Sequence, residues 1–350
     1  MRYFFSTLFL LSIGCVSAQV TLSADGPGNT YNLITSVLAP GQNPIEVPDC
    51  NHEDFGDHIE EVFDENLNTY VFRFVLHVEP DNDRCITFDR QRNEIKSYSP
   101  SPDNLLGVFG EKVIYKWKFK LPDGFQSSPS FTHIHQLKPV GGEFAKTPLI
   151  TLTTRKSNPD RLELRYADEG SQTTLSQTPL EQFIGEWIEV TEVITYEDNG
   201  TYELSLVRMS DKEELFSWVD LDIDTWRTGT EFVRPKWGIY RSLDEAEDLR
   251  DEEVFFNDFS IEEISTTSSK EEEFSQIILS NPVNKNLFIQ NIPTSVQDIQ
   301  IFNMSGSAIF NEKTNNQSSV NINVSNYESG TYVVLFKGNN VNQSRLFIIQ

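Results

Sequence analysis

The chain has 350 residues, with 53 Asp and Glu against 28 Lys and Arg, a formal net charge of −25 and three cysteines. This length suits one large β domain plus a smaller one, since β sandwiches and barrels often reach about 200–250 residues. So acidic a chain repels DNA and anionic membranes, which argues against nucleic-acid binding. Residues 88–165 nevertheless hold 13 Lys and Arg against 8 Asp and Glu. This basic stretch is either chance clustering on a solvated face or part of a site for a polyanion.

The N-terminus has the features of an export signal. A basic residue precedes the apolar run Tyr3–Val16, and Val16-Ser17-Ala18 matches a small-residue cleavage site. We predict a signal peptide over residues 1–18, a secreted protein and no membrane span, since the apolar run is too short for one. Ser12 stands where lipoprotein signals usually carry leucine, which disfavours lipid anchoring at Cys15.

Two cysteines, Cys50 and Cys85, remain once the signal is removed. An even pair in an oxidising compartment predicts a disulfide, with two free buried thiols as the alternative. The bridge would close a loop of about 35 residues and add on the order of 3–4 kcal/mol by the chain-entropy estimate.

Residues 19–264 have the pattern of short strands separated by turns. Tyr70–Val78 and Val113–Lys120 are examples of the strand-like runs, and clusters such as Asp198-Asn199-Gly200 mark turns. Many short strands without helical crossovers imply antiparallel sheets. We therefore predict an all-β protein with a β-jelly-roll, concanavalin-like sandwich over residues 19–264.

The sequence changes character after this region. Residues 265–275 are too polar and charged to bury a core and are predicted to be a linker. Residues 276–350 are rich in Asn and Ser and contain strand-like runs such as Ile299–Phe302 and Tyr332–Phe336. They predict a small C-terminal β-sandwich.

Four segments of this last region occur in the order typical of a known family: Ser280–Asn284, Ile301–Gly306, Tyr327–Tyr332 and Arg345–Gln350. Together they resemble the C-terminal sorting domain of the type IX secretion system of Bacteroidetes. The resemblance implies contact with that secretion machinery and export across the outer membrane. A carbohydrate-binding module is the competing interpretation, and the lack of clustered exposed Trp counts against it.

Three segments of the larger domain place polar residues at every second position, which puts them on one face of a strand. The segments are Arg92–Lys96, His133–His135 and Lys236–Ser242. Any one of them alone is more simply the wet side of an antiparallel sheet. Their combination offers a titratable base, a phenol, cations and a glycine that leaves room for a ligand.

The three segments together resemble the β-jelly-roll polysaccharide lyases typified by the alginate lyases. The family's Arg-x-Glu-x-Arg strand matches Arg92–Lys96, its Gln-Ile-His matches His133–His135, and its Lys-x-Gly-x-Tyr-x-Gln matches Lys236–Ser242. The resemblance covers most of residues 40–264 and implies a lyase of acidic polysaccharides.

Three departures from the alginate pattern put alginate in doubt as the substrate. Lys96 replaces an arginine, and His133 and Ser242 each replace a glutamine. The wider run Asp89–Lys138 is more similar to the glucuronan and ulvan lyases of marine bacteria. The short endolytic ulvan lyases of marine Bacteroidetes, which also end in a sorting domain, are most similar, and they imply an anionic polysaccharide, ulvan, as the substrate.

Eliminative cleavage at a uronic acid sets the roles expected of these residues. The adjacent carboxylate must be neutralised before a base removes the C5 proton, and Arg92 and His133 are the candidates. His135 is the expected base because an imidazole titrates near neutrality. Tyr240 is the expected acid toward the leaving O4, or both acid and base for the other uronic epimer. Six further residues are expected to line the substrate: Glu94, Lys96, Lys118, Lys236, Arg241 and Ser242.

No redox cofactor or catalytic metal is implied by this chemistry. Asp81-Asn82-Asp83 offers oxygen atoms of the kind a structural calcium ion prefers, but Asp and Asn are also ordinary turn residues, and the turn is the stronger interpretation. We expect a monomer.

Other functional classes fit less well. A glycoside hydrolase needs two carboxylates beside the scissile bond, and Glu94 is the only acidic residue in the three segments. A serine hydrolase would need a Gly-x-Ser-x-Gly elbow, which the sequence lacks. Glucuronan or alginate lyases remain alternatives, as does a lectin without turnover that keeps the basic residues but does not need His135 and Tyr240 together.

Overall fold

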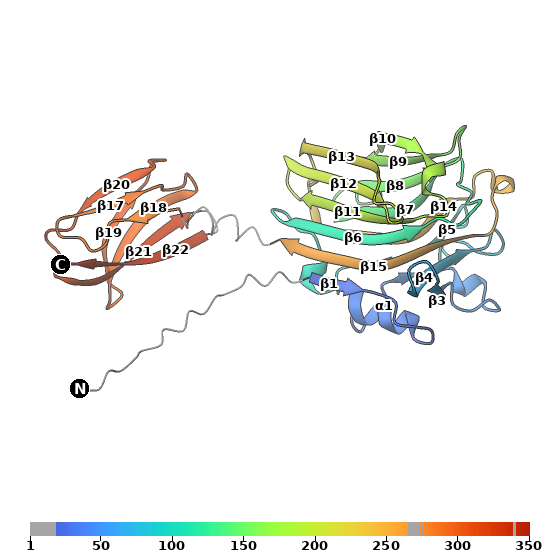
Figure 1. Ribbon diagram of the computed structural model, residues 1–350, viewed down its shortest axis with the longest axis horizontal. Helices are drawn as coiled ribbons and strands as arrows, with labels where there is room; N and C mark the ends of the chain where they lie inside the picture. The colour runs from blue at the N-terminus through green and yellow to red at the C-terminus, as the bar shows by residue number, and fades with distance from the viewer. Residues whose placement is uncertain (1–18, 265–273, 275, 339–340) are drawn as a thin grey trace. The chain divides into compact units, whose positions relative to one another are not determined.

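A computed structural model describes residues 19–264, 274, 276–338 and 341–350. These residues divide into two compact units, with the boundary after Ile264 (Figure 1). The predicted signal peptide and all but one residue of the predicted linker lie outside the described residues.

The larger unit consists of two antiparallel sheets. The first follows the order β13-β12-β11-β6-β15-β4-β3, with β1 added beside β15. Its strands are β1 (Gln19–Leu22), β3 (Ile59–Asp64), β4 (Thr69–Leu76), β6 (Lys112–Lys120), β11 (Trp187–Thr195), β12 (Gly200–Arg208), β13 (Glu214–Ile223) and β15 (Glu252–Ile264). The second sheet follows the order β10-β9-β8-β7-β14-β5-β2. Its strands are β2 (Ile45–Glu46), β5 (Arg90–Lys96), β7 (Thr132–Gly141), β8 (Ile150–Arg155), β9 (Arg161–Tyr166), β10 (Thr173–Pro179) and β14 (Thr230–Ser242).

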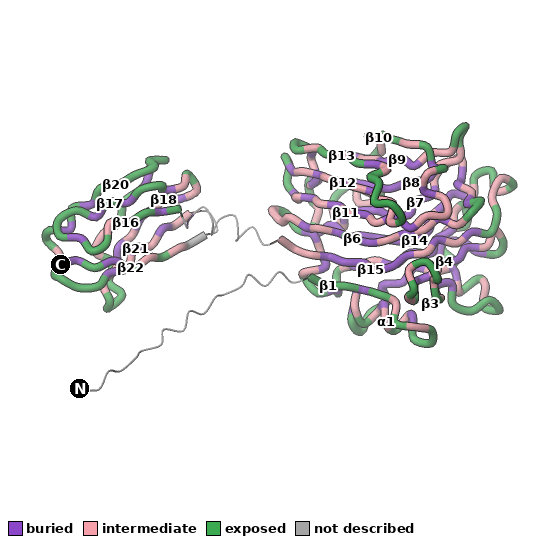
Figure 2. Tube along the Cα trace, in the orientation of Figure 1, coloured by how far each residue is buried: buried purple, intermediate pink, exposed green. Residues whose placement is uncertain are grey.

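The core lies between these two sheets, as the alternation of side chains requires. In β6, Val113, Tyr115, Trp117 and Phe119 are buried, while the lysines between them point to the other face. Figure 2 shows the same buried colouring along the central strands of both sheets. The all-β jelly-roll prediction is confirmed.

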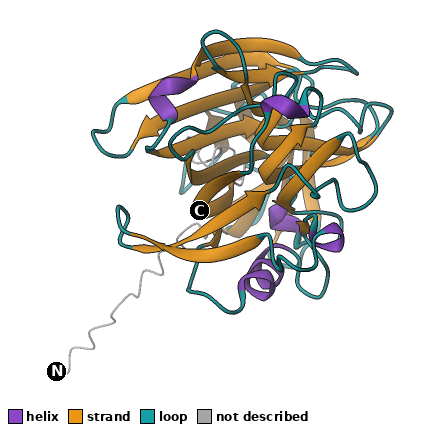
Figure 3. Ribbon diagram, turned by 90° about the vertical axis from the view of Figure 1, so that its right-hand side faces the viewer, coloured by secondary structure: helices purple, strands orange, loops and turns teal. Residues whose placement is uncertain are grey.

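Helical segments in the larger unit are short (Figure 3). The α-helix, α1 (Thr30–Leu38), buries Thr30, Ile34 and Leu38 along one face and ends just before Pro40, which cannot continue a helix. Four single turns of 3-10 helix connect strands: η1 (Asp49–Asn51), η2 (Asp103–Leu105), η3 (Leu180–Phe183) and η4 (Ala246–Asp248).

The smaller unit has a core of its own between two small antiparallel sheets, of order β16-β17-β20 and β19-β18-β21-β22. Its strands are β16 (Ile278–Leu279), β17 (Asn286–Gln290), β18 (Val296–Asn303), β19 (Ala308–Lys313), β20 (Ser319–Asn323), β21 (Gly330–Gly338) and β22 (Val341–Ile349). Apolar residues at alternate positions, such as Leu287 and Ile289, fill the space between the sheets. The unit is the small β-sandwich that the sequence predicts.

Cys50 and Cys85 form the predicted disulfide, with 6.4 Å between their Cα atoms and 35 residues between them in sequence. We expect the double substitution Cys50→Ser/Cys85→Ser to lower the free energy of unfolding by on the order of 3–4 kcal/mol, because the unfolded chain gains the entropy of an open loop. Urea unfolding followed by Trp fluorescence measures this loss, since all five Trp residues lie in the larger unit. An unchanged unfolding midpoint would show that the bridge adds nothing.

Candidate active site

The seven-stranded sheet turns one face toward the core and the other away from it, and the second face is basic. Strand register places its side chains together across β5, β14, β7, β8 and β9. Nine basic side chains lie on this surface, which we call the basic face: Arg90, Arg92, Lys96, Lys138, Arg155, Arg161, Arg165, Arg234 and Lys236. Five acidic side chains pair with these cations: Glu46, Asp83, Asp89, Glu94 and Glu163. A polyanion is therefore attracted to this face although the chain as a whole is acidic.

A β-bulge in the middle of the sheet changes which histidine reaches the basic face. His135 pairs with Trp237 and His133 with Tyr240, so Gly238 and Ile239 of β14 stand opposite one residue of β7. Gly238 has φ of +145°, and a Cβ atom there would lie 2.0 Å from the Asn93 carbonyl oxygen. Only glycine fits this close approach, so Gly238 shapes the bulge instead of leaving room for a ligand.

His135 therefore lies in the core, and the expectation that it shares a face with His133 is wrong. Its ring packs against Trp117 of the opposite sheet at 4.3 Å between centroids. Its Nε2 atom is 2.9 Å from Glu192 Oε2, also in the opposite sheet, and the residue is 1% exposed. A group held between the sheets cannot reach a substrate on the basic face.

His133 lies on the basic face, and its ring is held from two sides. Phe131 stacks on it at 4.8 Å between ring centroids, and Nδ1 is 2.8 Å from the Thr153 hydroxyl. Thr153 is hydrogen-bonded in turn to Thr151, which accepts a bond from Gln172. Burial, reinforced by nearby arginines, lowers the pKa of His133 to about 3, so the imidazole is neutral at ordinary pH.

Tyr240 stands next to His133, with 5.8 Å between the ring centroids. Arg90 Nη1 donates a hydrogen bond of 2.9 Å to the Tyr240 hydroxyl oxygen. The Arg92 guanidinium carbon lies 3.7 Å from the centre of the Tyr240 ring. Two cations thus surround one phenol on the basic face, an arrangement that stabilises negative charge on its oxygen.

Beside Tyr240 lies a buried cluster of ion pairs. Lys236 Nζ is 2.5 Å from Glu46 Oε2 and 2.5 Å from Glu94 Oε2. Arg92 also binds Glu94 and donates a 2.9 Å hydrogen bond to Asp83. Burial alone would raise the pKa of Glu94, but the charges of Lys236 and Arg92 lower it below its usual value. The same two cations lower the pKa of Glu46, so both carboxylates stay ionised.

These pairs change the role of several residues expected to hold substrate. Lys236 is only 2% exposed and neutralises the two carboxylates. Glu94 fixes Arg92 and Lys236 and accepts a bond from Gln136, while Lys96 donates to Glu46 at 2.7 Å. The cluster therefore orients Arg92 and supports the sheet instead of presenting free cations.

Of three other expected substrate ligands, Lys118 and Arg241 lie away from the basic face and Ser242 lies on it. Lys118 lies on the outer face of the other sheet, where its Nζ is 2.6 Å from Asp258. Arg241 is buried on the core side, donates to Gln91 at 2.8 Å, and has its pKa lowered to about 10 by burial. Ser242 lies on the Tyr240 side, but its hydroxyl accepts the Asp244 N–H in a turn.

Several residues of the basic face escaped the sequence analysis. Arg90 begins the strand that carries Arg92, and one further step of the same alternation places it beside Tyr240. Lys138 is two residues beyond Gln136, and burial, with the nearby charges of Lys236 and Arg92, lowers its pKa to about 7. Glu46 comes from a separate segment that carries no local signal, and Asp83 comes from the segment interpreted as a turn.

The segment Asp81-Asn82-Asp83, considered above for calcium, sends its three side chains to different partners. Asp81 faces three histidines, Asn82 accepts the Cys85 N–H, and Asp83 pairs with Arg84 and Arg92. Among the described residues, the group suited to a metal ion is instead His52, His58, His77 and Asp81. The hydrogen bonds of these four side chains do not involve Tyr240 or His133.

The family model that matches this chain covers the smaller unit. Residues 278–350 match the model of a family described as the secretion system C-terminal sorting domain. The match confirms the expected sorting domain, and the protein is secreted or displayed on the cell surface. In the described part of the chain, no helix combines the length and apolar character that membrane crossing requires. No curated protein matches the chain.

Solved structures similar to the chain include polysaccharide lyases. An endo-β-1,4-glucuronan lyase from the fungus Trichoderma reesei has 16% identity and a TM-score of 0.41, over 58% of this chain and 86% of its own. A marine alginate lyase from Aplysia kurodai has 12% identity and a TM-score of 0.47, over 69% and 97% respectively. An alginate lyase from Klebsiella pneumoniae has 10% identity and a TM-score of 0.42, over 63% and 95%.

Proposed function

We propose that this protein is a secreted, endolytic polysaccharide lyase that cleaves an acidic polysaccharide by β-elimination at a uronic acid. One observation carries the proposal: Tyr240 is held between Arg90, Arg92 and a neutral His133 on a basic face of an otherwise acidic chain. Acid–base groups and carboxylate-binding groups are the two requirements of this reaction.

His133 is suited to binding the uronate carboxylate. Gln172 Nε2 can only donate, so the Thr151 hydroxyl accepts that hydrogen bond. Each hydroxyl proton then has an acceptor if Thr151 donates to Thr153 and Thr153 donates to His133 Nδ1. In that arrangement the imidazole proton is on Nε2, which has no protein partner among the described residues. A neutral N–H donor on this face lowers the cost of charge that develops at the carboxylate.

Tyr240 takes the place of His135 as the proposed proton-transfer group. Its phenolate oxygen removes the C5 proton, the C4–C5 double bond forms, and the C4–O4 bond breaks. The leaving O4 takes a proton, which for elimination on one face of the sugar comes from the same phenol. The Arg90 hydrogen bond orients the oxygen and stabilises its charge between the two transfers.

Ulvan is the proposed polymer, with glucuronan and alginate as alternatives. The support is the sequence resemblance to the short ulvan lyases and the number of cations on the basic face beyond those paired with Glu46 and Glu94. Arg155, Arg161 and Arg165 surround the single carboxylate of Glu163, which leaves positive charge for sulfate or further carboxylate groups.

The direct test is the ultraviolet absorbance of unsaturated uronate while the purified full chain acts in parallel on ulvan, glucuronan and alginate. A rise on ulvan alone supports the whole proposal, and a rise on another polymer supports a lyase but corrects the substrate. If absorbance stays flat on all three while the chain still binds one of them, the protein is a lectin and the lyase proposal fails.

Replacing His135 by glutamine distinguishes its core position from a catalytic one. We expect His135→Gln to lower the free energy of unfolding by about 1–3 kcal/mol, because the buried hydrogen bond to Glu192 is weakened. The folded fraction should keep kcat within about twofold, because the ring does not reach the basic face. Steady-state kinetics below the unfolding transition give the answer, and a loss of kcat in fully folded protein would return His135 to the catalytic group.

A further inference from the structure

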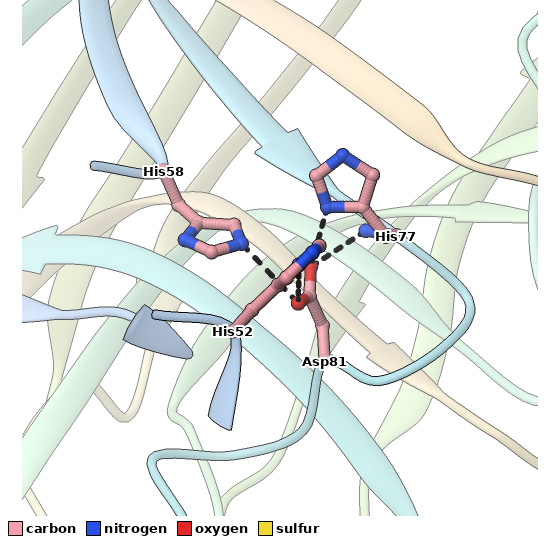
Figure 4. A group of neighbouring side chains, drawn as sticks. All are labelled: His52, His58, His77 and Asp81. Atoms are coloured by element: carbon pink, nitrogen blue, oxygen red, sulfur yellow. Dashed lines mark hydrogen bonds and ion pairs between the residues drawn. The ribbon is translucent and has the colours of Figure 1, made fainter. Parts of the chain in front are cut away.

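Three of the five histidines of the chain converge on one carboxylate. His52 Nδ1 and His58 Nε2 lie 3.0 and 3.2 Å from Asp81 Oδ1, and His77 Nδ1 lies 3.1 Å from Asp81 Oδ2. The four candidate ligand atoms all lie within 4.8 Å of one another. Figure 4 shows the three imidazole rings turned toward the Asp81 carboxylate from separate segments.

The backbone around this cluster is firmly held. His58 directly precedes β3 and His77 directly follows β4, two paired strands. His52 follows the η1 turn that contains Cys50, and the disulfide joins that turn to Cys85, four residues beyond Asp81. Gln91 Nε2 donates to the carbonyl oxygen of Asp81 at 3.0 Å. The four side chains are therefore brought together by a rigid frame, as a metal site requires.

A second layer of contacts orients the most buried histidine. His58 Nδ1 is 2.7 Å from Asp49 Oδ1, while its Nε2 faces Asp81. Asp49 also accepts the Tyr31 hydroxyl proton at 2.8 Å. A histidine that binds a metal ion through one ring nitrogen commonly donates the other N–H to a carboxylate, which fixes the tautomer. Asp49, His58 and the centre of the cluster reproduce that arrangement.

We propose that His52, His58, His77 and Asp81 bind one divalent transition-metal ion, zinc before others, in a structural site separate from the basic face. Three imidazole nitrogens and one carboxylate oxygen are a tetrahedral zinc set, whereas calcium and magnesium take oxygen ligands. Ligands at about 2.0–2.2 Å from a tetrahedral ion are about 3.3–3.5 Å apart. His52 Nδ1 and His58 Nε2 lie 3.0 and 3.2 Å from Asp81 Oδ1, which is close to this spacing, and His77 Nδ1 lies 3.1 Å from the second oxygen of the same carboxylate.

The ion has an entry path. The side chains of His52 and His77 are 22% and 17% exposed, while those of His58 and Asp81 are fully buried. A metal ion therefore approaches from the His52 and His77 side and completes the site against the buried pair.

The bound ion would hold in place the loop whose residues Asn82 and Asp83 bind Arg92. Asp81 is two residues from Asp83, whose carboxylate accepts the Arg92 Nε–H, and the Asn82 carbonyl accepts the Arg92 backbone N–H. With the ion bound, four segments of the larger unit are tied at one point next to the disulfide. We expect the ion to contribute to folding stability and not to a chemical step.

A proton competes for the same place. Burial disfavours the charged form of His58, but hydrogen bonds to Asp49 and Asp81 outweigh it and raise its pKa to about 9. Without a metal ion, the cluster is a hydrogen-bonded salt bridge between an imidazolium and two carboxylates. The experiment must therefore distinguish metal binding from this metal-free network.

Metal content of the purified, disulfide-intact full chain is the first measurement, by elemental analysis after dialysis against a chelator and reloading with zinc. We expect one zinc ion per chain, a melting temperature that rises on adding zinc, and the visible absorption of a tetrahedral site on loading with cobalt. The double variant His52→Ala/His77→Ala, which alters the two partly exposed rings, should lose the ion and the response to zinc. Asp49→Asn should weaken zinc affinity by about 10–100-fold.

Asp54→Asn is the matched control, because Asp54 is an exposed carboxylate in the same loop. It should bind zinc as the parent chain does. No zinc in the parent chain above the level of the double variant, or equal affinity in both, overturns the proposal and leaves the metal-free network. If the double variant does not fold, the cobalt spectrum of the parent chain is the deciding measurement. An octahedral spectrum also overturns the proposal of a tetrahedral site. None of these readouts depends on lyase activity.

Discussion

Replacing Tyr240 by phenylalanine lowers kcat on the cleaved polymer by about 10²–10⁴-fold, the contribution of a positioned acid–base group, while KM changes little. The substitution removes one oxygen atom and keeps the ring over Arg92 and against Phe131. Initial rates of the ultraviolet absorbance rise, with bound polymer measured separately, give kcat and affinity independently.

Tyr70→Phe is the matched control for this change. Tyr70 is partly exposed on β4 in the other sheet, so the same loss of a hydroxyl should leave kcat unchanged. If Tyr240→Phe keeps kcat within tenfold of the parent chain, the phenol is not the proton-transfer group. His133 would then be the remaining candidate, despite the lowered pKa that makes it a weak base.

The strand pattern of the sequence was enough to predict the part of the basic face around Tyr240. Period-two alternation correctly placed Arg92, Glu94, Lys236 and Tyr240 on one side of two neighbouring strands. It failed for His135 because a bulge shifts the register by one residue, and a shift of one residue turns a side chain to the opposite face. The sequence signal was Gly238, which was interpreted as space for a ligand and is a close contact of two backbones.

Charge alone misled the prediction for other residues. The strand that carries Lys118 alternates basic with other side chains, as the Arg92 strand does, and the composition of a strand does not say to which sheet it belongs. Alternation already sets Arg241 opposite to Tyr240, and the observed core position follows from that rule. Lys236 was expected to be free because its partner Glu46 lies about 190 residues away in a two-residue strand, which local patterns cannot connect to it.

The histidine cluster could not be predicted for a related reason. His52, His58 and His77 have no motif spacing and come from three loops, and Asp81 had a ready interpretation as a turn residue. Only the pairing of β3 with β4 and the disulfide bring them together. Long-range topology therefore decides the metal site, whereas local alternation decides the basic face.

Glu94→Gln should be the most destabilising single change on the basic face, with a loss of about 3–5 kcal/mol in the free energy of unfolding at neutral pH. Glu94 is 1% exposed and binds both Arg92 and Lys236, so the amide leaves two buried cations with less than their full complement of negative charge. Urea unfolding followed by Trp fluorescence reports on the larger unit alone. Glu65→Gln, an exposed turn carboxylate, is the control and should be neutral.

The loss of stability caused by Glu94→Gln should depend on pH with a definite sign. The pKa of Glu94 is lowered in the folded chain, so its contribution to stability is complete above the unfolded value of about 4.3 and decreases as pH falls toward the folded value. The difference in the free energy of unfolding between the parent chain and Glu94→Gln should therefore be constant from pH 8 to about pH 5 and become smaller below about pH 4. A gap that stays constant into acid would mean that Glu94 contributes through packing and hydrogen bonds and not through its charge. A gap that is small at neutral pH would mean that Glu46, the second carboxylate on Lys236, is sufficient to hold both cations.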